Sequence, residues 1–189
     1  MINIFAAHPD DCEISMGCFL LKNKKLPMRV IYATTGDYLD GHRNPSVFLR
    51  DIPFEHLSYK DCSLTNTIEL RQDLERIISP GDLNIVHWPD DTHKDHRELS
   101  QAVFDVCRGK NIIYYNSVSS QSFLGNLTFE YKESEMNRKV RRLQKAFSLD
   151  RPYLKREYFM RNLYNGVYTE SLHVKNCSAA VLSKLFGTE

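Results

Sequence analysis

Short apolar segments alternate along this chain with segments that carry a helical stripe of apolar residues, and this alternation restricts the fold more than any other feature. Residues 2–7 and 28–34 are nearly continuous in apolar character, which is typical of strands covered on both faces. Between them, apolar or small residues recur at the i, i+3, i+4, i+7 spacing of a helix, at Ile14, Gly17, Cys18 and Leu21. The chain therefore opens with a predicted βαβ unit.

The same alternation continues as far as Tyr115. A helical stripe over residues 70–78 stops at a Ser-Pro-Gly-Asp turn. Strands are predicted over residues 83–88 and 111–115, with a helix around residues 99–106 between them, and a short strand is expected over residues 54–59. Repeated units of this kind predict an α/β fold, a Rossmann-like three-layer sandwich with a mostly parallel sheet and helices on both faces.

The chain after Tyr115 has a different pattern. A fourth amphipathic helix is predicted around residues 136–147, and a fifth over residues 151–166. Residues 132–161 contain ten Lys or Arg and four Asp or Glu, a local charge of +6, which leaves −5 on the rest of the chain. Such charge is most often a solvated helix face, although it could also hold the phosphate groups of a nucleotide-linked sugar or of a nucleic acid.

Length and composition favour one domain. The chain has 189 residues, 42% of them hydrophobic, so we expect a single domain over residues 1–189, with a motif-bearing core at 1–115 and a variable helical part at 116–189. The formal net charge of +1 makes nucleic acid an unlikely partner, and no apolar run approaches the roughly 18 residues of a membrane span. Five cysteines without a C-x-x-C pair favour packed, reduced thiols and a cytoplasmic location.

The first predicted strand ends abruptly in His8-Pro9-Asp10-Asp11. In an open parallel sheet the functional crevice lies beyond the carboxyl ends of the strands, where this segment falls. Asp10 and Glu13 alone could form a capping box at the start of the next helix. That interpretation leaves His8 and the second carboxylate unexplained. Because adjacent anions repel and a cation relieves the cost, the segment favours a metal site.

A second cluster, PDDTHKDHRE at residues 89–98, follows the strand at 83–88 and therefore occupies the same sheet edge. His93 and His96 are three residues apart with Asp95 between them, a spacing that lets both imidazoles face one point at a helix start. Imidazole and carboxylate are good zinc ligands, and three protein ligands with an open position characterise catalytic zinc sites. A two-His, one-carboxylate set also suits Fe²⁺ or another divalent metal.

These motifs carry a family resemblance. AHPDD after the first strand, TTGD after the second and DTHKDHR after the fourth resemble, in content and order, the LmbE-like deacetylases. That family includes N-acetylglucosaminyl-phosphatidylinositol de-N-acetylase (PIG-L) and the de-N-acetylases of mycothiol and bacillithiol synthesis. The resemblance covers about residues 1–106. It implies a zinc-dependent N-deacetylase that removes the acetyl group from an N-acetylated amino sugar or a conjugate containing N-acetylglucosamine, releasing acetate and a free amine.

The resemblance also implies roles for individual residues. His8, Asp11 and His96 would bind the metal, Zn²⁺ first and Fe²⁺ or another divalent ion as alternatives. Asp10 would be the general base. The chemistry agrees, because an amide is a poor electrophile and zinc both polarises its carbonyl and lowers the pKa of bound water.

In the second motif, His93 would protonate or polarise the departing groups, oriented by Asp95. Lys94 stands where the family usually has proline. The family's substrate-binding arginine after the second strand corresponds best to Arg50, with Arg43 as a competitor. The implied partner is a small amino-sugar substrate, with or without a phosphate group.

Two other functions stay open at this stage. The same site could cleave another small amide, such as a thiol conjugate. A non-catalytic module that binds phosphate or nucleic acid could have retained the metal site, but the ligands, the base and the His-Asp pair are all present together. A homo-oligomer also stays open, since a neighbouring subunit could complete the substrate pocket.

Overall fold

The computed structural model describes residues 1–36, 43–147 and 151–187. Asp37 of the TTGD motif and part of the loop between the strands predicted over residues 28–34 and 54–59 lie outside this set. The second half of that loop contains a short helix, α2 (Pro45–Leu49). No helix among the described residues is long and apolar enough to cross a membrane.

The five strands expected from the sequence form the parallel part of an eight-stranded sheet, in the order β3-β2-β1-β4-β5. They are β1 (Ile2–Ala6), β2 (Met28–Thr34), β3 (Phe54–Tyr59), β4 (Leu83–His87) and β5 (Ile112–Tyr115). β1 and β4 lie side by side, with Ile4 opposite Ile85, so the His8 and His93 segments leave the sheet at the same edge.

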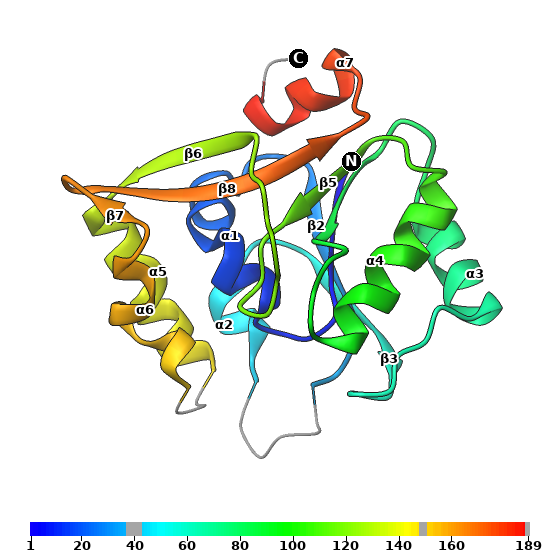
Figure 1. Cartoon of the computed structure of the whole chain (residues 1–189), viewed down its shortest axis with the longest axis horizontal. Helices are drawn as coiled ribbons and strands as arrows, with labels where there is room; N and C mark the ends of the chain where they lie inside the picture. The colour runs from blue at the N-terminus through cyan, green and yellow to red at the C-terminus, as the bar shows by residue number, and fades with distance from the viewer. Residues whose placement is uncertain (37–42, 148–150, 188–189) are drawn as a thin grey trace.

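Helices cover both faces of this sheet, as predicted (Figure 1). One core cluster lies between the sheet and α1 (Asp11–Lys22), α2 and α5 (Glu133–Ala146), and the other lies under α3 (Ile68–Ile77) and α4 (Lys94–Cys107). Strand β1 contributes to both, because alternate side chains point to opposite faces: Ile4 joins the first cluster and Phe5 the second. The prediction of a three-layer α/β fold is confirmed.

The segment after Tyr115 is less helical than expected. It adds β6 (Leu127–Lys132), β7 (Leu163–Tyr164) and β8 (Val167–Lys175), with β8 antiparallel to β5, β6 and β7. Short helices complete it, namely η1 (Pro152–Leu154), α6 (Arg156–Met160), α7 (Ala179–Leu182) and η2 (Ser183–Phe186). Of the fifth helix predicted over residues 151–166 only the short η1 and α6 form, because the dipeptide Asn165-Gly166, with both φ angles positive, closes a β7–β8 hairpin at the end of this range.

The first helix is kinked and held by a buried ion pair. Met16 has non-helical dihedral angles, so the amides of Cys18 and Phe19 begin a new helical segment, and both donate to the carboxylate of Glu170 at 2.9 and 3.0 Å. Lys139 of α5 is fully buried and donates to the same carboxylate at 2.7 Å. One group expected on the basic surface of α5 therefore stabilises α1.

Candidate metal centre and active site

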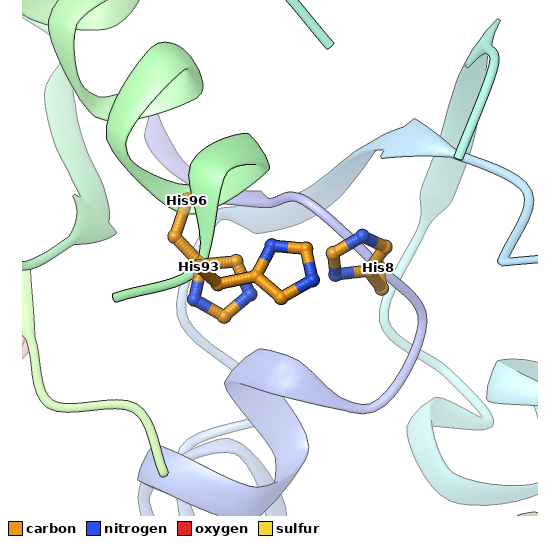
Figure 2. Close-up of side chains that lie close together, drawn as sticks. All are labelled: His8, His93 and His96. Atoms are coloured by element: carbon orange, nitrogen blue, oxygen red, sulfur yellow. The ribbon is translucent and has the colours of Figure 1, made fainter. Parts of the chain in front are cut away.

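Three side chains from the two sequence motifs converge beyond the carboxyl ends of β1 and β4. The Nδ1 atom of His8 lies 3.2 Å from Oδ2 of Asp11, and the Nε2 atom of His96 lies 3.4 Å from Oδ1 of the same carboxylate. His8 comes from the loop after β1, whereas His96 lies in the first turn of α4 (Figure 2). The three residues that the resemblance implies as metal ligands are thus in mutual contact.

Further carboxylates contact the outer nitrogen of each imidazole. The Nε2 atom of His8 lies 2.8 Å from Asp61 and 3.2 Å from Asp95, and the Nδ1 atom of His96 lies 3.1 Å from Asp91. If each outer nitrogen carries the proton and donates it to these carboxylates, the nitrogen that faces Asp11 keeps its lone pair. This is the arrangement in which imidazoles bind metals, oriented by carboxylates behind them.

The buried carboxylates also determine the charge of the imidazoles in the structure. Burial opposes protonation of His8, but Asp11, Asp61 and Asp95 outweigh it and raise the pKa of His8 to about 12. Burial likewise opposes a charge on His96, and Asp11 and Asp91 raise its pKa to about 9. The cluster thus attracts positive charge strongly, as a cation site must.

This donor set fits a divalent metal. His8, Asp11 and His96 supply two imidazoles and one carboxylate, a combination that suits zinc or ferrous iron. Three sets of side chains in the described part of the chain have ligand atoms close enough to share an ion: His8, His93 and His96; Asp11, His87 and His96; His8, Asp61 and Asp95. Because these sets overlap at His8 and His96, they describe one centre with several available ligands.

His93 lies between the two imidazoles that contact Asp11. Its ring centre is 4.8 Å from that of His8 and 4.6 Å from that of His96 (Figure 2). The sequence expectation that Asp95 orients His93 is wrong. Asp95 is fully buried and accepts from the backbone amides of Cys62 and Leu64 at 2.8 and 3.0 Å, besides contacting His8.

The buried Nδ1 atom of His93 has no hydrogen-bond partner among the described residues. Burial, His96 and His8 all lower the pKa of this imidazole. His93 therefore remains close to the centre with a nitrogen available for another group.

Asp10 is buried beside the centre in a backbone conformation that few residues adopt. Its φ of 129° lies in a region that costs about 1–3 kcal/mol for a residue with a side chain. Burial raises the pKa of its carboxyl to about 8, although Arg43, whose Nη1 lies 3.4 Å from Oδ1, acts in the opposite direction. A buried carboxylate with a raised pKa is a suitable proton acceptor.

The arginine in this cavity is Arg43 rather than Arg50. Arg43 also donates to the carbonyl of Pro9 at 3.3 Å, and its buried Nε atom has no hydrogen-bond partner among the described residues. Arg50 is exposed at the C-terminal end of α2 and does not line the cavity. The expectation of Arg50 as the substrate-binding arginine is therefore replaced by its competitor, Arg43.

Glu13 is not the helix cap that the sequence suggested. Asp10 makes no side-chain capping hydrogen bond, and Glu13 is fully buried, where it accepts from the hydroxyl of Tyr32 and the thiol of Cys12. Burial raises the pKa of Glu13 to about 7.

Sequence reasoning also missed His87, the last residue of β4. Its ring is stacked on His96 at 3.9 Å, and its Nε2 atom accepts from the amide of Ala7 at 3.0 Å and lies 2.9 Å from the hydroxyl of Tyr115. Burial lowers its pKa to about 4. His87 thus packs against a proposed ligand and belongs to one of the sets that could share an ion, although its Nε2 atom already accepts a hydrogen bond. Its position at the end of β4 is the sequence signal that could have found it.

The centre opens into a cavity of about 380 Å³. Side chains of the two motifs line it together with Arg43 and with residues that follow β3 and β5, and the segment after α5 contributes Arg151 and Tyr153. Cys62 also lines it and is exposed, unlike the packed thiols expected; all five cysteines are free. The cavity joins the candidate ligands to the candidate base.

The fold is the one that solved deacetylases of the LmbE type share. No family model and no curated protein sequence matches the chain, so the likeness is one of structure. The N,N′-diacetylchitobiose deacetylase from Pyrococcus horikoshii superposes with a TM-score of 0.63 at 20% identity, over 91% of this chain and 82% of that one.

Two further solved structures show how widely this fold is used. The zinc-inhibited form of teicoplanin deacetylase matches with a TM-score of 0.57 at 13% identity, over 92% of this chain and 98% of that one. The 4-carboxy-2-hydroxymuconate hydratase from Pseudomonas putida matches with a TM-score of 0.64 at 13% identity, over 91% and 94%. Since a hydratase shares the fold, the reaction must be argued from the site.

Proposed function

We propose that this protein is a metal-dependent N-deacetylase that hydrolyses the acetamido group of an N-acetylated amino sugar, releasing acetate and a free amine. One observation carries the proposal: Asp11 contacts an imidazole from each motif, and the buried carboxylate of Asp10 lines the same cavity. The deacetylases among the structural neighbours support the same reaction class.

The proposed ligands are His8, Asp11 and His96. A divalent metal bound there would polarise the acetamido carbonyl and lower the pKa of a water molecule. Asp61 and Asp95 would hold the ring of His8, and Asp91 that of His96, so that the nitrogen facing Asp11 stays free of a proton.

Asp10 acts as the general base. Its carboxylate takes a proton from the water that attacks the carbonyl carbon, and Arg43 keeps enough of Asp10 ionised for this task. As the carbon–nitrogen bond breaks, the leaving nitrogen receives the proton that Asp10 took from the water, and His93 is the candidate to polarise or protonate that nitrogen because it lines the same cavity. Atoms balance as amide plus water giving acetate plus amine.

The substrate class rests on the residues around the cavity. Arg43 and Arg151 both line it, which supports an amino sugar that carries an anionic group such as phosphate. Tyr153 offers an aromatic face and a hydroxyl for the sugar. Another small amide would use the same chemistry and is included in the test.

The test measures acetate and amine release by protein loaded with Zn²⁺ or Fe²⁺, with metal content determined in the same samples. Substrates are N-acetylglucosamine, its phosphorylated derivative and an acetylated thiol conjugate. We expect metal-dependent release from the sugars, abolished by chelation. Asp10→Asn should lower kcat by about 100-fold or more while retaining metal, in line with the usual contribution of general acid–base catalysis.

Asp90→Asn is the matched control, because Asp90 is an exposed acid in the second motif segment that does not line the cavity. It should leave release unchanged. Folded, metal-loaded protein that releases no amine from any substrate would refute the proposal, as would full activity of Asp10→Asn.

A further inference from the structure

The excess of basic residues in the segment 132–161 gathers at one end of the molecule. α5, α6 and the β7–β8 hairpin form this end, whereas α3 and α4 lie at the other (Figure 1). Arg138, Arg141 and Lys145 are exposed along α5, and none of the three forms an ion pair with a described residue. Because a helix rises about 1.5 Å per residue, these cations spread over roughly 10 Å of surface and suit an extended anionic partner.

The carboxylates at this end are fewer than the cations, and two of them are already paired. Glu135 of α5 lies 3.5 Å from Lys22 of α1, and Glu133 pairs with Arg156 of α6. Glu157 of α6 is exposed and forms no ion pair with a described residue. One unpaired carboxylate thus stands against the three unpaired cations of α5, and a net positive surface remains.

Like charges are crowded where α5 meets α2. Arg142 donates to the carbonyl of Phe48 at 3.0 Å, and burial together with Arg50 and Arg138 lowers its pKa. Arg138 also lines a cavity of about 260 Å³ with Lys22 of α1, so two cations face one small space. An anion bound among these groups relieves their repulsion, and a phosphate can accept hydrogen bonds from both walls of the cavity.

Apolar side chains protrude beside these cations. Eight large hydrophobic side chains are exposed in the described part of the chain, and three of them fall within residues 160–167. They are Met160, 40% exposed, Tyr164, 79% exposed, and Val167, 39% exposed. Val167 is opposite the exposed Lys132 in the β6–β8 ladder, and the exposed Arg161 follows Met160. Apolar side chains ringed by cations are typical of surfaces that rest on an anionic bilayer.

We propose that this end of the protein, formed by the outer face of α5 and by the β7–β8 hairpin, docks on the surface of an anionic lipid bilayer. Arg138, Arg141 and Lys145 contact the lipid phosphates. Tyr164 and Val167 enter the boundary between head groups and acyl chains. A nucleic acid could pair with the same cations but would leave the apolar side chains of the hairpin in water, so the observations favour a bilayer. The proposal does not depend on the deacetylase reaction.

The test is co-sedimentation of the full chain with vesicles of phosphatidylcholine, with or without about 30% phosphatidylserine. We expect binding to the vesicles that contain phosphatidylserine and release from them at high salt, because salt screens the attraction. Arg138→Gln combined with Arg141→Gln should weaken this binding by about 20-fold, since each cation near an anionic surface contributes about fivefold. Tyr164→Ser should weaken it by about threefold or more, because it removes an aromatic ring from the interface.

Each variant has a matched control at the other end of the molecule. Arg108→Gln combined with Lys110→Gln removes the same charge from exposed positions after α4 and should change the binding by less than about twofold, because distant charges are screened. Ile68→Ser removes an apolar side chain that is 61% exposed at the start of α3, and it should leave the binding unchanged. Thermal unfolding checks every variant, and if one docking variant is unfolded the other decides the result.

Several outcomes would overturn the docking surface. They are no binding to the anionic vesicles, binding that does not need phosphatidylserine, equal weakening by the two double variants, and a folded Tyr164→Ser variant that binds like the wild type. Duplex DNA and single-stranded RNA are titrated in parallel, and tighter binding of either than of the vesicles would assign the cations to nucleic acid instead. Since no step measures acetate release, failure of this proposal leaves the deacetylase function standing, and the reverse also holds.

Discussion

The Nδ1 atom of His96 lies 3.1 Å from a carboxylate oxygen of Asp91, on the side of the ring that faces away from Asp11. The same oxygen of Asp91 accepts from the hydroxyls of Ser117 and Ser120. Asp91 thus links the second motif to the segment after β5. This carboxylate fixes both the orientation of His96 and the nitrogen that carries its proton.

Asp91→Asn should lower Zn²⁺ affinity by about 10–100-fold, because the amide removes the charge that holds the Nδ1 proton of His96. Competition with a chromophoric chelator measures this affinity. Asp105→Asn, on the α4 helix that carries His96 but bound to Asn66 and Gln101, should leave this affinity unchanged. Unaltered affinity in Asp91→Asn would show that Asp91 does not support a metal ligand.

Arg43→Met should move the acidic limb of the kcat/KM profile to higher pH by about one unit. Arg43 lowers the pKa of Asp10, so its removal raises that pKa, and the ionised base then forms only at higher pH. The pH profile of acetate release measures the shift. Arg50→Met is the matched control, since Arg50 is exposed outside the cavity. An equal shift in both variants would contradict the assignment.

Glu13→Gln should remove part of the pH dependence of stability. The pKa of Glu13 is about 7 in the folded protein against a reference of 4.5, so the folded state binds the proton more tightly. Between these values the wild type therefore loses stability as pH rises, by up to about 1.4 kcal/mol per pH unit. The glutamine side chain of the variant would still accept from Tyr32 and carries no charge.

Urea unfolding of metal-free wild type and Glu13→Gln between pH 5 and pH 8 measures this effect. The variant should gain about 1–3 kcal/mol relative to the wild type over that range. A difference between the two proteins that does not change with pH would mean that Glu13 titrates as in the unfolded chain.

Lys139→Met should lower the free energy of unfolding by about 3–5 kcal/mol, because it leaves the buried carboxylate of Glu170 without its cation. Lys145→Met, at an exposed position on the same helix, should cost within about 0.5 kcal/mol. Adding Glu170→Gln to Lys139→Met should recover part of the loss. Equal stability of Lys139→Met and Lys145→Met would remove the structural role given to this pair.

The parallel half of the fold could be predicted from the sequence because its signals are local. The continuous apolar run of β1 indicates a strand buried on both faces, and the apolar stripe of α3 indicates a helix buried on one face. Neither pattern depends on the segments next to it. The antiparallel half was missed because its strands alternate weakly. The side chains of β8 are alternately buried only because β6 and α5 cover one face of this strand. The Asn165-Gly166 dipeptide was the one local signal of a hairpin.

The candidate site divides in the same way. His8, Asp11, His93 and His96 could be named from the sequence because they follow two strands that end at one sheet edge, which the βα alternation by itself determined. Only the tertiary structure decided which carboxylate faces which imidazole, that Arg43 and not Arg50 enters the cavity, and that Glu13 is a core group. Those contacts join residues far apart in the chain. Which residues pair depends on which charged or proton-bearing groups the fold buries away from water.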